Sequence, residues 1–247
     1  MSVSGADESG RSLIVNADDF GQSHGINQGV ALAHTDGIVT SASMMVRWPA
    51  VSEAVVWARA RSGFSLGLHL DLGEWRYDVA TFSWVPVYEV VPLDDAELVY
   101  AEVRAQCDRF VELVGRGPTH LDSHQHVHLR EPIRAIVLEE AARLGAPVRS
   151  AASPACYSGA FYGQSSGGWP VPAAIQPEAL IALLEKLPPG LTELGCHPAT
   201  EVDFTTMYRD ERIQELSTLT DPAVQAAARR LGIKLVPFPE PDRTVTA

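Results

Sequence analysis

Histidines and one aspartate recur at every second position in the stretch THLDSHQHVH, residues 119–128. The recurring positions are His120, Asp122, His124, His126 and His128. Side chains alternate between the two faces of an extended strand, so this period predicts that all of them share one face. Neutral imidazole is a common metal ligand, and a nearby carboxylate can orient it by a hydrogen bond. The stretch therefore indicates a metal site; the alternative is a surface strand that is merely rich in histidine.

Two other segments end in side chains that could complete such a site. LIVNADDFG, residues 13–21, predicts a short apolar strand that runs into two carboxylates, and LGLHLDL, residues 66–72, surrounds His69. Neighbouring side chains of an extended chain point in different directions, so we expect Asp18 and Asp19 to have different roles, one as a ligand and the other as a base. Two histidines and one carboxylate from separate strands form a ligand set that leaves positions open for water and substrate.

A fourth segment, ELGCHPAT at residues 193–200, places His197 after another short apolar strand. Imidazole titrates near neutral pH, so a histidine at the mouth of a metal site is a candidate general acid. Simpler roles remain open for all these residues. Asp18 or Asp19 could cap the helix that follows, His69 could be a hydrogen-bonded core histidine, and His197 could cap a loop.

The elements that must position these residues alternate between strands and helices along the chain. Strands are predicted at residues 13–16, 38–46, 65–70, 119–124, 147–150, 191–196 and 233–236. Helices are predicted at residues 25–35, 50–61, 95–114, 131–144, 177–186 and 222–231. The candidate residues lie at the carboxyl ends of predicted strands, where parallel barrels build their active sites. The sequence therefore predicts an α/β fold, an irregular (β/α) TIM-like barrel of about seven parallel strands.

One domain from residue 12 to residue 240 is expected to hold this barrel, because 247 residues with 46% hydrophobic content can bury one large core. Residues 1–11 have neither an apolar core nor a basic lead and are predicted to be a disordered tail. An open doubly wound sheet is the alternative fold, but it gathers ligands only near its switch point. Candidate residues on four separate strands favour the barrel.

The composition is acidic, with a formal net charge of −12 from 19 basic and 31 acidic residues. Such a surface repels polyanions, which argues against nucleic acid as a partner. The three cysteines, Cys107, Cys156 and Cys196, are widely spaced and form neither a disulfide framework nor a CxxC metal motif. No apolar run reaches the ~18 residues of a membrane span. We expect a cytoplasmic protein without membrane contact, for which a homodimer is compatible with the sequence.

Six segments resemble the YdjC/ChbG-like carbohydrate deacetylases, in the order found in that family. They are NADDFG at 16–21, GIVTSAS at 37–43, LGLHL at 66–70, THLDSHQHVH at 119–128, FYG at 161–163 and ELGCHP at 193–198. The resemblance covers residues 12–238 and implies a (β/α)-barrel. It also implies that Asp19, His69 and His124 bind one divalent cation, Mg²⁺ or Zn²⁺.

The resemblance further implies that the protein removes acetyl groups from N-acetylated sugars, including chitooligosaccharides. Asp18 is implied as the base that activates water, and His197 as the acid. The expected chemistry is metal-assisted amide hydrolysis, in which the cation lowers the pKa of a bound water from ~15.7 towards neutrality and polarises the acetyl carbonyl. Asp122, His126 and His128 are assigned no step.

Two other classes of function remain as alternatives. A phosphoesterase on the same barrel would need Arg or Lys near the site or a second metal cluster, and the four motifs supply neither. A non-catalytic barrel that binds sugar or metal would have no use for a free base, so Asp18 beside Asp19 argues against it.

Two aromatic segments bear on the substrate. Residues 71–93 depart from the family and contain Trp75, Tyr77 and Trp84, while the long irregular stretch 151–176 contains Phe161, Tyr162 and Trp169. These rings could stack on the apolar faces of sugars, or they could only fix the two segments to the barrel.

Overall fold

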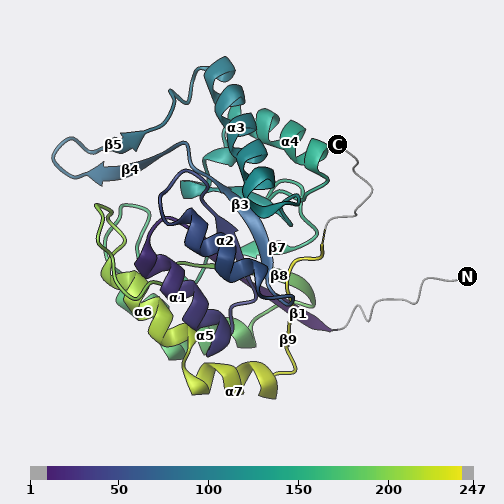
Figure 1. Cartoon of the computed structure of the whole chain (residues 1–247). Helices are drawn as coiled ribbons and strands as arrows, with labels where there is room; N and C mark the ends of the chain where they lie inside the picture. Colours follow the sequence, from purple (N-terminus) through teal and green to yellow (C-terminus); the bar gives the residue numbers. More distant parts are fainter. Residues whose placement is uncertain (1–9, 241–247) are drawn as a thin grey trace, which may run out of the picture.

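Seven parallel strands form the central sheet of the computed structural model, which describes residues 10–240 (Figure 1). They are β1 (Arg11–Phe20), β2 (Ser41–Met44), β3 (Ser65–Leu70), β6 (Leu121–Ser123), β7 (Cys156–Ser158), β8 (Gly190–Cys196) and β9 (Lys234–Leu235). Their order is β6-β3-β2-β1-β8-β7, and β9 pairs with the first part of β1. Among the described residues the edge strands β6 and β7 do not pair with each other, so the sheet is a curled, incomplete barrel. The predicted α/β fold with parallel strands is confirmed.

The described residues also contain α-helices and two short 3₁₀ helices, η1 and η2. Their bounds are α1 (His24–Thr35), α2 (Val51–Arg59), α3 (Ala96–Val114), η1 (His124–Leu129), α4 (Ile133–Leu144), η2 (Pro172–Ile175), α5 (Pro177–Glu185), α6 (Asp210–Leu219) and α7 (Pro222–Arg230). Side-chain caps fix several of their starts, as the sequence signals require. At α1 the cap is Ser23, whose Oγ accepts from the Ile26 N–H, so neither Asp18 nor Asp19 fills that role.

The two sides of the sheet differ in character because alternate residues of each strand face opposite ways. Side chains on the outer side join the helices in the main apolar core, among them Leu13, Val15 and Ala17 of β1 and Leu66, Leu68 and Leu70 of β3. Side chains on the inner side are just as buried but largely polar, among them Asn16, Asp18, Ser41, Ser43, His69, Asp122 and Glu193. Buried polar groups are stable only when they are hydrogen-bonded or paired. The interior of the barrel is therefore where the reactive groups concentrate.

The histidine-rich stretch is a strand only at its start. Strand β6 ends at Ser123, and the chain then turns through η1 with Gln125 at φ 51° and His126 at φ 54°. Both residues lie in the left-handed region, which breaks the two-residue alternation. The prediction that all five side chains share one face is therefore wrong beyond Asp122, and His124 reaches the interior from the turn.

Several element boundaries also differ from the sequence prediction. Residues 147–150 are not a strand, because Val148 makes only isolated bridges to Leu121 and Ala152. Strand β7 and helix α6 were not predicted. The first strand begins at Arg11, inside the stretch predicted as a tail, while residues 1–9 of that stretch lie outside the described residues.

An antiparallel hairpin of β4 (Gly73–Asp78) and β5 (Ser83–Glu89) forms a second sheet that the sequence did not predict. It extends away from the barrel beside α3 (Figure 1). The base of the hairpin is fixed by Asp71, whose carboxylate accepts from Tyr88 Oη at 2.9 Å and from Trp48 Nε1 at 3.0 Å.

A Gly67→Ala substitution is expected to destabilise the fold. A Cβ at Gly67 would overlap the imidazole of His120, which cannot retreat because it stacks on Phe238 with ring centroids 3.9 Å apart. Overpacking of this kind typically costs about 1–3 kcal/mol of unfolding free energy, measurable by urea denaturation. Gly63→Ala is the matched control, since a Cβ there meets no atom within 4 Å. Equal midpoints for the two variants would contradict this packing.

Candidate metal and catalytic site

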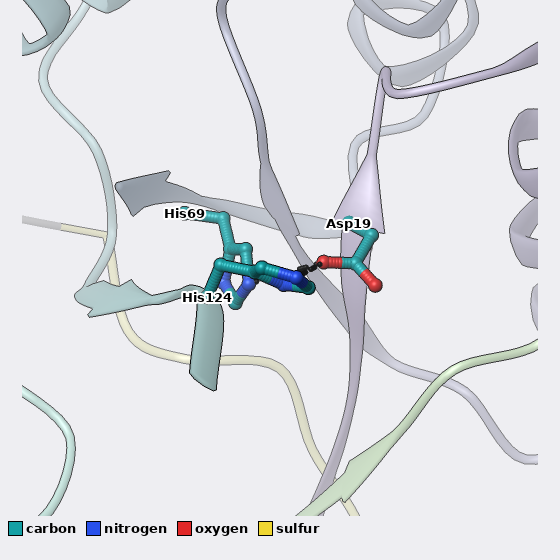
Figure 2. Close-up of side chains that lie close together, drawn as sticks. All are labelled: Asp19, His69 and His124. Atoms are coloured by element: carbon teal, nitrogen blue, oxygen red, sulfur yellow. Dashed lines mark hydrogen bonds and ion pairs between the residues drawn. The ribbon is translucent and has the colours of Figure 1, made fainter. Parts of the chain in front are cut away.

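Asp19, His69 and His124 meet at the carboxyl ends of β1, β3 and β6 (Figure 2). Asp19 Oδ1 lies 3.2 Å from His69 Nε2 and 3.1 Å from His124 Nδ1. One candidate ligand atom from each residue lies within 4.8 Å of the other two. Two imidazoles and a carboxylate at this spacing can hold one divalent cation and leave coordination positions open.

The backbone at Asp19 is adapted to this arrangement. The pairing of β1 with β2 shifts register between Ala17 and Phe20, and Asp19 adopts φ 65°. A left-handed conformation costs a non-glycine residue on the order of 1 kcal/mol and is concentrated at functional sites. Its consequence is that Asp18 and Asp19, although adjacent, both reach the interior and contact different partners there.

Arg212 of α6 fixes the other oxygen of Asp19. Arg212 Nη2 donates to Asp19 Oδ2 at 2.6 Å, and both side chains are buried. Burial alone would raise the pKa of Asp19, but Arg212 and then His124 outweigh it, so the pKa lies well below its usual value. Asp19 is thus held as a carboxylate with one oxygen on a guanidinium and the other turned to the two imidazoles.

Asp122 orients His69. Asp122 Oδ1 lies 2.8 Å from His69 Nδ1, and a carboxylate accepts only, so the hydrogen on that bond belongs to Nδ1. The lone pair of Nε2 is then available to a cation on the Asp19 side. Burial would lower the pKa of both imidazoles, but Asp122 raises that of His69 well above its usual value, and Asp19 raises that of His124 to about 9. Metal binding at these nitrogens must therefore release protons.

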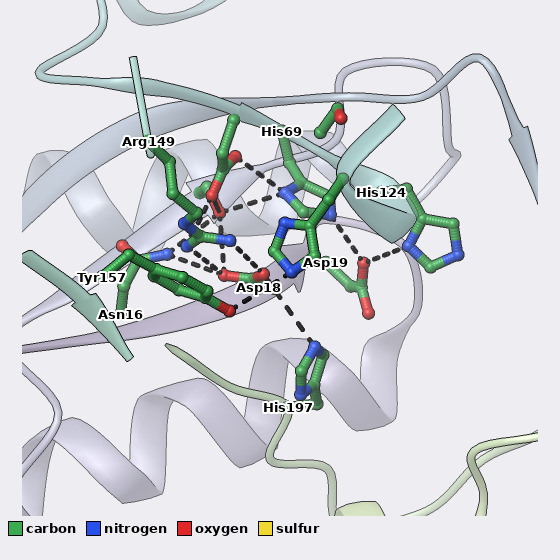
Figure 3. Close-up of polar contacts among 12 residues, drawn as sticks. Asn16, Asp18, Asp19, His69, His124, Arg149, Tyr157 and His197 are labelled. Carbon is green, nitrogen blue, oxygen red and sulfur yellow. Dashed lines mark hydrogen bonds and ion pairs between the residues drawn. The ribbon is translucent and has the colours of Figure 1, made fainter. Parts of the chain in front are cut away.

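Arg149 joins three carboxylates behind the site (Figure 3). Its guanidinium binds Asp18 through two hydrogen bonds of 2.7 and 2.8 Å, Asp122 at 2.6 Å and Glu193 at 2.7 Å. Burial by itself would raise the pKa of Asp18, but Arg149 outweighs it and holds that pKa below its usual range. Asp18 is therefore ionised. A second group, Asp18, His69 and Asp122, also has ligand atoms within 4.8 Å of one another. Arg149 already binds both of its carboxylates, so this group is a poorer candidate for a metal.

His197 lies across from Asp18 after β8, as predicted. His197 Nε2 is 3.9 Å from Asp18 Oδ2 (Figure 3). On the far side of the ring, Nδ1 lies 3.7 Å from Glu215 Oε1, and the His197 backbone N–H donates to the same carboxylate. Tyr208 Oη also donates to Glu215. Glu215 thus fixes the backbone at His197 and places its carboxylate behind the ring, while Nε2 faces Asp18.

The other histidines of the stretch have different surroundings. His120 stacks at the far end of the interior, and His128 is buried with Nε2 3.0 Å from the Arg149 carbonyl oxygen. His126 faces the open side, with Nε2 3.4 Å from Tyr157 Oη.

Sequence reasoning missed the residues that position the site, among them Arg149, Arg212 and Glu215. Arg149 stands in no motif. Arg212 and Glu215 are three residues apart on α6. Charges of opposite sign at this spacing are typical of an exposed helix face, so the sequence pattern predicts that both side chains lie in solvent.

A cavity of about 750 Å³ opens onto these groups. Asp18, His69 and His197 line it, together with Tyr162 of the long loop. Trp169 is 62% exposed and is not among the lining residues. A cavity of this size lies within the range that encloses small-molecule ligands.

Residues 12–230 match the family model of YdjC-like proteins. The chain belongs to the YdjC-like family. This YdjC-like chain is 33% identical to the chitooligosaccharide deacetylase of Klebsiella pneumoniae (strain 342), over 91% of this chain and 97% of that protein. It is 31% identical to the carbohydrate deacetylase of Geobacillus stearothermophilus, over 93% of this chain and 98% of that protein.

A solved structure from Enterococcus faecalis V583, provisionally assigned as a cellobiose-phosphate cleavage protein, is similar to this YdjC-like chain throughout. The TM-score is 0.74 at 28% identity, covering 93% of this chain and 98% of that one. The family resemblance predicted from the six segments is confirmed.

Proposed function

We propose that this YdjC-like protein is a metal-dependent deacetylase of N-acetylated sugars, with chitooligosaccharides as the first substrates to test. The observation that carries the proposal is one cavity lined by the Asp18–His197 pair and by His69, which belongs to the Asp–His–His cluster. The names of the two relatives support the substrate class.

The metal is proposed to bind at Asp19, His69 and His124. When bound, a divalent cation there would polarise the acetyl carbonyl and make the attacking water more acidic. Two nitrogen ligands and one oxygen ligand suit Zn²⁺, and Mg²⁺ with additional waters is the alternative.

Asp18 is proposed as the base. Arg149 keeps it ionised, and it lines the cavity beside His69. The same guanidinium lowers its affinity for a proton, so Asp18 can serve only a water that has already been made more acidic. Such a base must lie directly beside the metal cluster, because that is where the water is made more acidic.

His197 is proposed as the acid. Glu215, which also accepts from Tyr208, fixes the His197 backbone, and ring Nε2 lies 3.9 Å from Asp18 at the cavity. From there it can donate a proton to the departing sugar amine, without which the tetrahedral intermediate would expel hydroxide instead. Proton transfer by a positioned side chain is typically worth ~10²–10⁴ in rate.

The two alternative classes find less support. Sequence reasoning found no arginine near the site for a phosphoesterase, whereas the structure has Arg149 and Arg212 there. Both guanidiniums are buried and paired with carboxylates, so neither offers an unpaired charge to a phosphate. A purely binding protein would have no use for an ionised Asp18 facing an imidazole across the cavity.

Location and assembly stay predictions. None of the helices in residues 10–240 is both long and apolar enough to cross a membrane. We propose that the protein is cytoplasmic, that it forms a homodimer and that nucleic acid is not among its partners.

Acetate release from N-acetylglucosamine oligomers tests the function directly. We expect turnover that falls to background after a chelator removes divalent cations and returns when Zn²⁺ or Mg²⁺ is added back. A phosphate monoester run in parallel should yield no phosphate. Acetate release that survives complete metal removal, or turnover of the phosphate ester alone, would contradict the proposal.

A further inference from the structure

The β4–β5 hairpin turns one aromatic face toward the cavity. Strand pairing sets Tyr77 opposite Trp84 and Trp75 opposite Pro86, so these side chains share a face of the hairpin. Trp75 and Trp84 both line the cavity that contains Asp18 and His197. Tyr77 packs edge-on against Trp84, with ring centroids 5.7 Å apart.

The base of this hairpin is tied to the metal cluster. Gln125, the residue after His124, accepts from the Trp75 backbone N–H at 2.9 Å and donates to the Trp75 carbonyl at 2.7 Å. The backbone that carries the inner ring, Trp75, is therefore fixed relative to the proposed ligands. The hairpin is a wall of the site and not an independent appendage.

The outer ring is exposed. Trp84 keeps 50% of its surface accessible although it is a large apolar side chain. A two-stranded hairpin gains little stability in water on its own, and an exposed aromatic ring on a cavity wall is typical of ligand binding. The cavity, at about 750 Å³, has room for more than one sugar ring.

We propose that Trp84, with Trp75 behind it, is a stacking subsite for a second sugar ring, one unit away from the ring that carries the reacting acetamide. The subsite makes the enzyme prefer oligomers to the monosaccharide, because only a substrate with a second ring gains the contact with Trp84. The apolar C–H face of a pyranose matches an indole ring, and its hydroxyls stay in water. This inference rests on the proposed function, since it assumes an N-acetylated oligosaccharide.

Trp84→Ala is the test, with Phe82→Ala as its control. Phe82 lies at the hairpin turn, is 79% exposed and is not among the lining residues. Initial rates of acetate release are measured for N-acetylglucosamine and its dimer, trimer and tetramer. Trp84→Ala should lower kcat/KM for the oligomers by on the order of tenfold, as expected when a large aromatic surface no longer buries against the ligand, and leave the monosaccharide unchanged. Trp84→Phe should recover part of the loss, and Phe82→Ala should match wild type.

Any of the following outcomes would contradict the proposed subsite. An equal loss on monomer and oligomers, or no loss, removes the length dependence that defines it. A change in oligomeric state of Trp84→Ala in light scattering would instead assign the ring to an interface between copies. If no sugar is deacetylated, the proposed function fails, and calorimetric binding of the trimer still decides the subsite: equal affinity in wild type and Trp84→Ala, or no binding to either, excludes it.

Discussion

An Asp18→Asn variant is expected to lose ~10²-fold or more in kcat while binding as much metal as the wild type. Asparagine keeps the shape and one acceptor oxygen for Arg149, but it cannot take a proton. Arg149 retains Asp122 and Glu193 at 2.6 and 2.7 Å, so its buried charge keeps partners and the fold should persist. Steady-state kinetics and metal analysis on one preparation measure both quantities.

The matched variant is Asp19→Asn, which changes the neighbouring carboxylate by the same single atom. Asp19 contacts Arg212 and the two histidines but not Arg149, so its loss should weaken metal binding and leave the Asp18 network in place. Metal retained by Asp19→Asn and lost by Asp18→Asn would exchange the two roles and leave the rest of the mechanism standing.

A His124→Ala variant is expected to lose metal and activity together, with metal affinity lower by on the order of 100-fold or more, because one of three protein ligands is removed from an open site. The His124 side chain lies at the edge of the interior, outside the main apolar core, so its truncation should not disrupt the packing of that core. Competition with a chromogenic chelator at limiting metal gives the affinity, and circular dichroism checks the fold.

His126→Ala is the control for that experiment. His126 belongs to the same turn and lines the cavity, but it contacts Tyr157 and none of the three proposed ligands. His128 is a poorer control because it is fully buried against the Arg149 carbonyl and its truncation would disturb the core. Full metal stoichiometry in His124→Ala at limiting metal would show that the ligand assignment is wrong.

The sequence was sufficient to predict that the groups proposed to carry the chemistry lie together. Asp18, His69 and His197 each stand in or directly after an apolar strand, and parallel strands deliver such residues to the same edge of a sheet. The same reasoning reached His124 for a partly wrong reason, since the strand that was to present it ends at Ser123. A turn with two left-handed residues has no local signal when neither residue is glycine.

The sequence could not predict which residues, distant along the chain, bind the two aspartates. Arg149 binds Asp18 from 131 positions away, and Arg212 binds Asp19 from 193 positions away. A lone arginine is ordinarily a surface residue, and only the tertiary fold brings these two to buried carboxylates. The hairpin was missed although residues 74–78 alternate polar and aromatic side chains, because that run is short and its partner strand, SWVPVYE at 83–89, contains a proline and has no such alternation.

The paired base of the hairpin has an evolutionary consequence. Gly73 and Glu89 lie opposite each other where the hairpin leaves the barrel, so residues inserted or deleted near the turn at 79–82 do not alter the distance between β3 and α3. Within β1 a single inserted residue would exchange the inward carboxylates for the outward apolar side chains. The hairpin can thus vary in length while β1 cannot, so a change in the proposed sugar subsite would leave the proposed catalytic groups in place.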